Sequence, residues 1–259
     1  MKSIPLLYTD VQGTGPTVVL LHGFLASSKY WHKVTELVSQ NYKVVAVDLL
    51  GFGDSPKPRK GKYDYDDHIN SINATLDQLE INEPFILMGH SMGSLIALRY
   101  ATIHDDRIRK LVLTNMPVML GRDEVRDTIF KNNMIYKLGL SNYTHQLVWP
   151  MFRFLYRTRL LPQKAILKVQ TNIDFLFSHK AHSRLRSFQK VIEDARVDID
   201  LRAVEVKTVI LAGVEDKKIY LENLLNNIPL RANIIVETIQ TGHHIPRLMP
   251  ELIADEIKR

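Results

Sequence analysis

The chain has 259 residues, enough for one large domain with a substantial hydrophobic core and an insertion. It contains no cysteine, which excludes disulfides and thiol chemistry, and no apolar run of about eighteen residues, so we expect no transmembrane helix. The first residues lack the apolar core of a signal peptide, and together with the absence of cysteine this favours a cytoplasmic protein.

Short, nearly continuous apolar runs alternate with helical patterns along the chain. Such runs are typical of parallel strands covered on both faces, so the alternation predicts an α/β fold, with a mostly parallel twisted sheet and helices on both faces. The predicted strands are 17–21, 42–47, 85–88, 110–114, 208–213 and 233–237. The predicted helices between them are 31–39, 66–79, 92–103, 219–226 and 250–258.

The pentapeptide Gly89-His90-Ser91-Met92-Gly93 lies between the third predicted strand and the helix after it. G-x-S-x-G in a strand–turn–helix context is typical of a nucleophile elbow, with the serine at the apex of a sharp turn. We expect a strained backbone at Ser91, which lifts its hydroxyl out of the sheet. We also expect that a Cβ at either glycine would clash where the strand and the helix approach closely.

Four motifs in this order resemble those of the α/β-hydrolase family. They are His22-Gly23-Phe24 after the first strand, Gly51-Phe52-Gly53-Asp54-Ser55 after the second, the pentapeptide around Ser91, and Gly242-His243 near the end. The resemblance covers essentially the whole chain and is more specific than any one motif. It implies the α/β-hydrolase fold, in which the nucleophile, the acid and the histidine follow in that order along the chain.

The resemblance implies a catalytic triad of Ser91, Asp216 and His243. A serine hydroxyl needs an adjacent base, and the base needs a carboxylate that fixes its tautomer. All three would lie at the carboxyl ends of strands, where open α/β sheets place their sites. Two alternatives stay open: Glu215 for the acid and His244 for the base. The family spacing favours Asp216, and the position directly after glycine favours His243.

Acyl transfer also needs donors for the developing oxyanion. The backbone N–H of Met92, directly after the nucleophile, is one, and the resemblance indicates the N–H of Phe24 as the other. The Phe24 side chain is expected to line the acyl site. We expect His22 to hold its loop by hydrogen bonds rather than to act in catalysis. This chemistry requires no metal or other cofactor.

The stretch between the fourth and fifth strands is too long for a loop and too irregular for another βα unit. Family members often insert a helical cap here, so the resemblance implies a core domain of 1–115 and 202–259 and a cap of 116–201. The cap is rich in aromatic residues, and Trp149 and Phe152 are predicted to contact substrate. The predicted cap helices are 123–138, 144–157, 163–178 and 182–194.

The predicted cap is strongly basic. Residues 131–190 hold eleven Lys or Arg residues and one acidic residue, whereas the whole chain has a net charge of +6. One interpretation is a solvated helical surface, and the other is a surface that attracts an anionic substrate or an anionic membrane, allowing peripheral membrane contact. Basic residues mixed with aromatic ones resemble an interfacial helix, which would suit a lipid-like ester. No nucleic-acid-binding motif accompanies the charge, so we expect no nucleic-acid partner.

Together these features predict a serine hydrolase that cleaves small-molecule carboxylic esters of small or medium acyl chains through an acyl-enzyme. Serine at position 91 argues against dehalogenase and epoxide hydrolase chemistry, for which related family members carry aspartate there. Other roles stay open: a C–C bond hydrolase or lyase acting on an anionic dienoate-type substrate, a perhydrolase, and a ligand receptor with slow hydrolysis. The sequence does not predict an oligomeric state.

Overall fold

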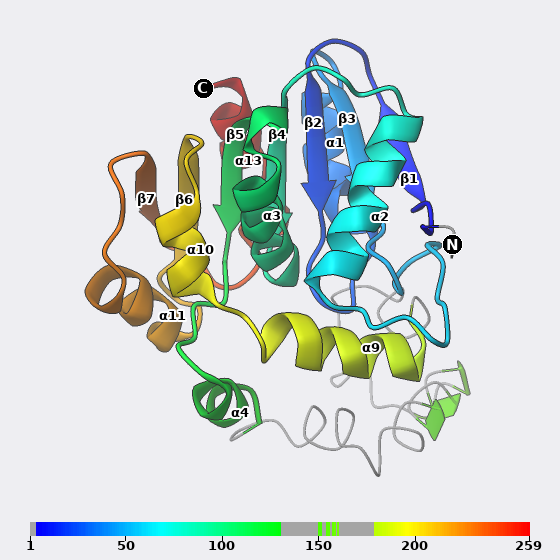
Figure 1. Ribbon diagram of the computed structural model, residues 1–259, viewed down its shortest axis with the longest axis vertical. Coiled ribbons are helices and arrows are strands. Elements are labelled where there is room, and N and C mark those ends of the chain that lie inside the picture. The colour runs from blue at the N-terminus through cyan, green and yellow to red at the C-terminus, as the bar shows by residue number, and fades with distance from the viewer. Residues whose placement is uncertain (1–3, 131–149, 152–153, 156, 159, 161–178) are drawn as a thin grey trace.

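The computed structural model describes residues 4–130, 150–151, 154–155, 157–158, 160 and 179–259, and its centre is a seven-stranded sheet (Figure 1). The strand order is β1-β3-β2-β4-β5-β6-β7. β1 is antiparallel to β3, and every other neighbouring pair is parallel. This confirms the predicted mostly parallel sheet. The strands are β1 Thr9–Gln12, β2 Thr17–Leu21, β3 Lys43–Val47, β4 Phe85–His90, β5 Ile108–Thr114, β6 Thr208–Gly213 and β7 Ile234–Ile239.

The central strands are mostly apolar because both faces of the sheet are covered. Successive side chains of a strand point to opposite faces. In β2, Val19 and Leu21 therefore belong to one hydrophobic core, and Val18 and Leu20 belong to the other. All six residues of β4 are buried, so the strand that leads to Ser91 is held rigidly from both sides.

Helices cover the two faces in separate layers (Figure 1). α1 and α13 pack against each other on one face, and α2, α3 and α10 lie on the opposite face. The helices predicted at 66–79, 92–103 and 250–258 are confirmed as α2, α3 and α13. The bounds of these helices are α1 His32–Val38, α2 Tyr65–Gln78, α3 Met92–Ile103, α10 Val197–Ala203 and α13 Pro250–Lys258.

Shorter helical turns connect the layers and shape the loops near the site. The predicted helix 31–39 divides into a 3-10 turn and α1, and the predicted helix 219–226 divides into α11 and a π-helical turn. These turns are η1 Ser28–Trp31, η2 Asp105–Arg107, α11 Lys218–Glu222, η4 Asn223–Asn227 and α12 Ile245–Leu248.

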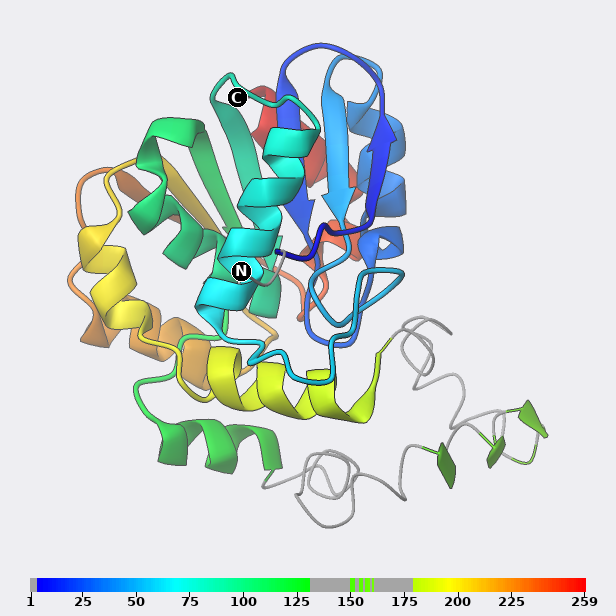
Figure 2. The same cartoon turned by 45° about the vertical axis from the view of Figure 1, so that its right-hand side comes forward.

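Helices α4 (Arg122–Phe130) and α9 (Ala181–Ser187) lie beyond the carboxyl ends of the strands, as Figure 2 also shows. Helix α9 is attached to the loop after β3: the Ser183 hydroxyl donates to the Gly51 carbonyl at 2.8 Å, and Arg186 donates to the Gly61 carbonyl at 2.6 Å. The predicted helices 144–157 and 163–178 lie largely or wholly outside the described residues. The helices with described bounds are α4 Arg122–Phe130, α9 Ala181–Ser187 and η3 Phe188–Ile192.

Helix α10 runs across the predicted boundary between cap and core at residues 201 and 202. It packs on α3, where Asp200 accepts from the Arg99 guanidinium at 2.7 Å. The extent of the cap domain stays a prediction. No helix in the described part of the chain has the length and hydropathy of a membrane span.

One buried side chain on α2 predicts a pH dependence of stability. His68 is fully buried, and neither ring nitrogen has a hydrogen-bond partner among the described residues. Burial lowers the pKa of His68 to about 3. An unfolded imidazole titrates near 6.5, so below about pH 6.5 the unfolded chain binds more protons and the free energy of unfolding falls, with a cost of about 2 kcal/mol at pH 5.

The variant His68→Leu should remove this cost. Its free energy of unfolding is expected to fall less between pH 7 and pH 5 than that of the unmodified protein, measured by urea denaturation. His32→Leu, which changes an exposed histidine on α1, is the control and should keep the original pH dependence. An equal loss of stability in His68→Leu and the unmodified protein would contradict the prediction.

Candidate active site

Ser91 lies at the sharp turn between β4 and α3. Its φ of 51° and ψ of −119° place a non-glycine residue in a strained region of backbone space, as the pentapeptide predicts. A Cβ at Gly89 would lie 2.4 Å from the Gly93 carbonyl oxygen, and a Cβ at Gly93 would lie 2.4 Å from the Leu21 carbonyl oxygen. Both glycines are therefore required for the close approach of strand and helix.

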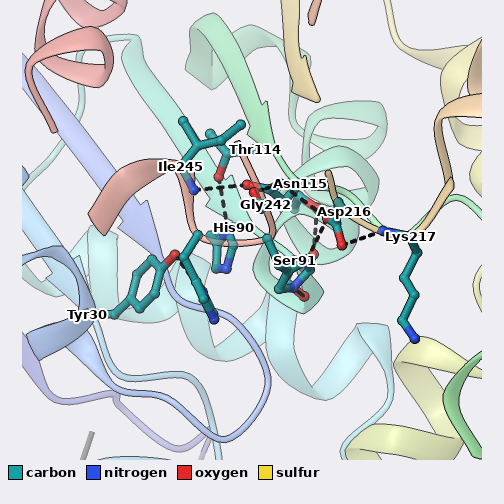
Figure 3. A network of polar contacts seen from close by, with 12 residues as sticks. Tyr30, His90, Ser91, Thr114, Asn115, Asp216, Lys217, Gly242 and Ile245 are labelled. Carbon is teal, nitrogen blue, oxygen red and sulfur yellow. Dashed lines mark hydrogen bonds and ion pairs between the residues drawn. The ribbon is translucent and has the colours of Figure 1, made fainter. Parts of the chain in front are cut away.

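The structure brings the three predicted catalytic side chains together from three loops. Ser91 follows β4, Asp216 follows β6, and His243 follows β7. The His243 Nε2 lies 3.0 Å from the Ser91 hydroxyl, and its Nδ1 lies 2.6 Å from Asp216 Oδ2. Figure 3 shows Ser91 and Asp216 near each other in the site. A hydroxyl, an imidazole and a carboxylate in this sequence of contacts can transfer a proton from the serine and stabilise the imidazolium that forms.

Glu215 and His244, the alternatives for the acid and the base, lie away from the line of contacts between Ser91, His243 and Asp216. Glu215 is exposed and has no side-chain contact with His243 among the described residues, whereas its backbone N–H donates to the Thr241 carbonyl at 3.0 Å. The ring of His244 turns towards Tyr30, with its Nδ1 3.4 Å from the Tyr30 hydroxyl. The geometry therefore favours Asp216 over Glu215 and His243 over His244.

Asp216 is held in its ionised form. Desolvation would raise the pKa of Asp216, but hydrogen bonds from His243, from the Lys217 backbone N–H at 2.7 Å and from Asn115 at 3.2 Å together hold this pKa below its usual value. The carboxylate can then accept the Nδ1 proton of His243 at neutral pH. This fixes the tautomer in which Nε2 is free to accept a proton from Ser91.

Neutral rings surround His243. His90 is buried and stacks on Tyr30, with ring centroids 4.6 Å apart, and its own centroid lies 5.1 Å from that of His243. Burial, followed by the neighbouring His243 and His244, holds the pKa of His90 well below its usual value. Burial, His243 and Arg247 lower the pKa of His244 to about 4. Neither neighbouring ring is charged at neutral pH, so neither repels an imidazolium on His243.

His22 fixes the loop after β2, as expected from the sequence. It is fully buried, its Nδ1 donates to the Gly23 carbonyl at 2.7 Å, and its Nε2 accepts from the Leu49 backbone N–H at 3.0 Å. Burial lowers the pKa of His22, which agrees with this neutral ring. The loop lies against the elbow, since a Cβ at Gly23 would be 3.2 Å from the Ser91 Cβ.

The two predicted oxyanion donors flank this contact. The backbone N–H groups of Phe24 and Met92 donate to no acceptor in the described part of the chain. The Phe24 ring lies 6.0 Å from each of the rings of Phe52 and Phe188, between the loop after β3 and the helical region after α9. Trp149 and Phe152, the other two predicted substrate contacts, lie outside the described residues.

The structure adds two residues that sequence reasoning missed. Asn115 hydrogen-bonds Asp216, and Tyr30 stacks on His90 and contacts His244. A signal for Asn115 exists, because it directly follows a predicted strand at the edge of the sheet where such sites lie. Tyr30 lies in η1, directly before α1, and no pattern in the sequence indicates that its side chain reaches the site.

Comparisons with known proteins agree with the fold. A family model for the alpha/beta hydrolase fold matches residues 16–136. The chain is 36% identical over 110 residues to the probable lysophospholipase BODYGUARD 4 of Arabidopsis thaliana, covering 42% of this chain and 26% of that protein. It is 26% identical over 277 residues to the uncharacterized hydrolase YugF of Bacillus subtilis, covering 99% of this chain and 94% of that protein.

The match to the BODYGUARD 4 protein spans about a quarter of that relative's length. Among solved structures, an esterase from Exiguobacterium antarcticum superposes with a TM-score of 0.74 at 23% identity, over 98% of this chain and 96% of that one. The family match and this similarity of fold agree with the order of motifs along the sequence. The chain has the α/β-hydrolase fold.

Proposed function

We propose that the protein is a serine hydrolase that cleaves carboxylic esters of small or medium acyl chains through a triad of Ser91, His243 and Asp216. The observation that carries the proposal is the continuous line of contacts from the Ser91 hydroxyl through His243 to Asp216 on a strained elbow. The similarity to a probable lysophospholipase and the fold shared with an esterase support ester cleavage.

The geometry supports the following first half-reaction. The Ser91 Oγ attacks the ester carbonyl while His243 Nε2 takes its proton. The carbonyl oxygen becomes an oxyanion that accepts from the N–H groups of Phe24 and Met92, and Asp216 stabilises the imidazolium. His243 then gives the proton to the ester oxygen, the C–O bond breaks, and the alcohol leaves an acyl-enzyme on Ser91.

Water completes the cycle by the same groups. His243 takes a proton from a water molecule whose oxygen attacks the acyl carbonyl, and the same two N–H groups hold the second oxyanion. The proton returns to the Ser91 Oγ as the acyl C–O bond breaks, and the free acid leaves. No metal or cofactor enters this sequence of steps.

Substrate preference is proposed to depend on the apolar wall around Phe24 and on the cap. Several of the described basic side chains in the predicted cap contact other protein groups. Arg184 is buried beside His179, Arg186 donates to loop carbonyls, and Lys190 lies 3.5 Å from Asp194. A preference for anionic or lipid-like esters would therefore depend chiefly on basic residues outside the described part of the chain.

The direct test is hydrolysis of p-nitrophenyl esters from acetate to palmitate. We expect turnover that is fastest with small or medium acyl chains, because the Phe24 ring, which follows Gly23 beside the elbow, packs against the bulky rings of Phe52 and Phe188. A palmitate optimum would overturn the proposed chain length and favour a lipid-facing cap. Negligible turnover across the series would contradict ester hydrolysis and direct attention to a dienoate substrate or a receptor role.

The acid of the triad can be tested with two neighbouring residues. Asp216→Asn is expected to lower kcat by about 10⁴-fold, because an amide cannot stabilise the imidazolium and favours the wrong tautomer of His243. Glu215→Gln is the matched control, since Glu215 is exposed, and it should keep kcat within about twofold. Comparable losses in the two variants, measured by steady-state kinetics, would contradict the role of Asp216.

A further inference from the structure

Asn115 occupies a strained and buried position directly after β5. Its φ is 48°, in the left-handed region that asparagine tolerates better than most residues, and only 2% of its surface is exposed. Its backbone N–H donates to the Leu211 carbonyl at 2.9 Å, so β6 fixes the main chain here. The side chain points towards the loops that carry Asp216 and His243 (Figure 3).

The amide of Asn115 uses both its donors and its acceptor. Nδ2 donates to Asp216 Oδ2 at 3.2 Å and to the Gly242 carbonyl at 3.1 Å, and Oδ1 accepts from the Ile245 backbone N–H at 3.3 Å. A carboxylate and a carbonyl only accept, and a backbone N–H only donates. The chemistry of the partners therefore determines which end of the amide faces which group.

These bonds enclose the catalytic histidine. Gly242 directly precedes His243, and Ile245 follows it by two residues, so the histidine loop is held on both sides. The third bond goes to Asp216 Oδ2, the same oxygen that contacts His243 Nδ1. One side chain thus connects the acid loop with the histidine loop and sets their separation.

We propose that Asn115 is a positioning residue that holds the His243–Asp216 pair in register with Ser91. The inference rests on the proposed function, in which this pair activates the serine. Asparagine suits the position for two reasons: it accepts the left-handed backbone, and its amide matches two acceptors and one donor. Glycine would meet only the first requirement, and aspartate would keep the shape while losing both donors.

The first test is Asn115→Gly, which permits the backbone conformation and removes the amide. Because a displaced base slows proton transfer without weakening substrate contacts, we expect kcat to fall by about 10- to 100-fold and KM to stay within about threefold. The rate at which a fluorophosphonate probe labels Ser91 should fall by a similar factor, since labelling also needs the activated serine.

The matched control is Asn233→Ala, at the amino end of β7. The Asn233 amide also donates two hydrogen bonds, to the Val204 and Val206 carbonyls, at 3.2 and 2.8 Å. This variant should lower the melting temperature while leaving kcat within about twofold. If Asn115→Gly behaves like Asn233→Ala, with lower stability and unchanged kcat, the role of Asn115 is structural only and the proposal is wrong.

The second test is Asn115→Asp, which keeps the shape and so remains informative if the glycine variant does not fold. A carboxylate here would face Asp216 and the Gly242 carbonyl, and its negative charge would favour the protonated form of the adjacent pair. We expect kcat to fall, and the acid limb of the kcat/KM profile to move to higher pH by about one unit. An unchanged pH profile and an unchanged kcat would overturn the proposal.

The fluorophosphonate probe distinguishes failure of the proposed serine hydrolase activity from failure of the positioning role of Asn115. If the unmodified protein does not react with the probe, the proposed serine hydrolase activity fails, and the role of Asn115 fails with it. If the unmodified protein reacts and Asn115→Gly reacts at the same rate, the activity stands and only the positioning role is rejected.

Discussion

Ser91→Ala is expected to lower kcat for the preferred p-nitrophenyl ester by about 10⁵-fold or more. The variant removes the only hydroxyl that His243 contacts among the described residues, so no acyl-enzyme can form. Turnover from the oxyanion donors and substrate binding alone should remain, as in other serine hydrolases that lack their nucleophile. Steady-state kinetics on purified protein, with the melting temperature recorded in parallel, measure this effect.

Ser71→Ala is the matched control for this variant. Ser71 is a buried serine on α2, and its hydroxyl has no hydrogen-bond partner among the described residues, so its removal should leave kcat within about twofold. A Ser91→Ala variant that is folded yet keeps more than about one hundredth of the original kcat would mean that a different group is the nucleophile.

His243→Gln is expected to reduce kcat by about 10⁵-fold, comparable to the loss of the serine, because nucleophile and base act as one unit. Glutamine fills similar space but cannot take the Ser91 proton or carry the positive charge that Asp216 stabilises. The rate of fluorophosphonate labelling should fall as well. These losses should occur without a change in KM larger than about threefold.

His244→Gln provides the internal comparison. Its ring contacts Tyr30 and not Ser91, and its pKa of about 4 keeps it neutral during turnover. This variant should therefore retain kcat within about tenfold. A result in which His244→Gln is inactive and His243→Gln is active would reverse the assignment of the base and contradict the geometry.

Most strands were predictable because a strand that is buried on both faces appears in the sequence as a short apolar run. β2 and β6 have the predicted bounds, and β4 and β5 extend the predicted runs by two residues each at one end. β1 was missed because it is a short edge strand whose residues, Thr9–Gln12, are partly exposed and mostly polar. Such a strand is defined by its antiparallel pairing with β3 and not by an apolar run.

The site was predictable as far as its chemistry follows from motif order. Ser91 is specified by its own turn, but the choices between Asp216 and Glu215 and between His243 and His244 depend on how two loops turn after their strands. Periodicity carries no information on side-chain direction within such loops.

Asn115 was missed because its role depends on partners far along the chain. Its side chain bonds Asp216 and Gly242, which lie 101 and 127 positions further along the chain. Only the pairing of β5 with β6 brings these partners within reach of Asn115. Contacts of this kind arise from the assembled sheet, so a reading of local patterns does not find them.

The most direct test of the central claim locates the nucleophile chemically. The protein is incubated with a fluorophosphonate, digested and analysed by mass spectrometry, beside His243→Gln treated in the same way. We predict one phosphonyl adduct, on Ser91 of the unmodified protein, and at least about a hundredfold less of it in the variant. Absence of an adduct, or an adduct on another residue, would contradict a hydrolase that works through Ser91 and His243.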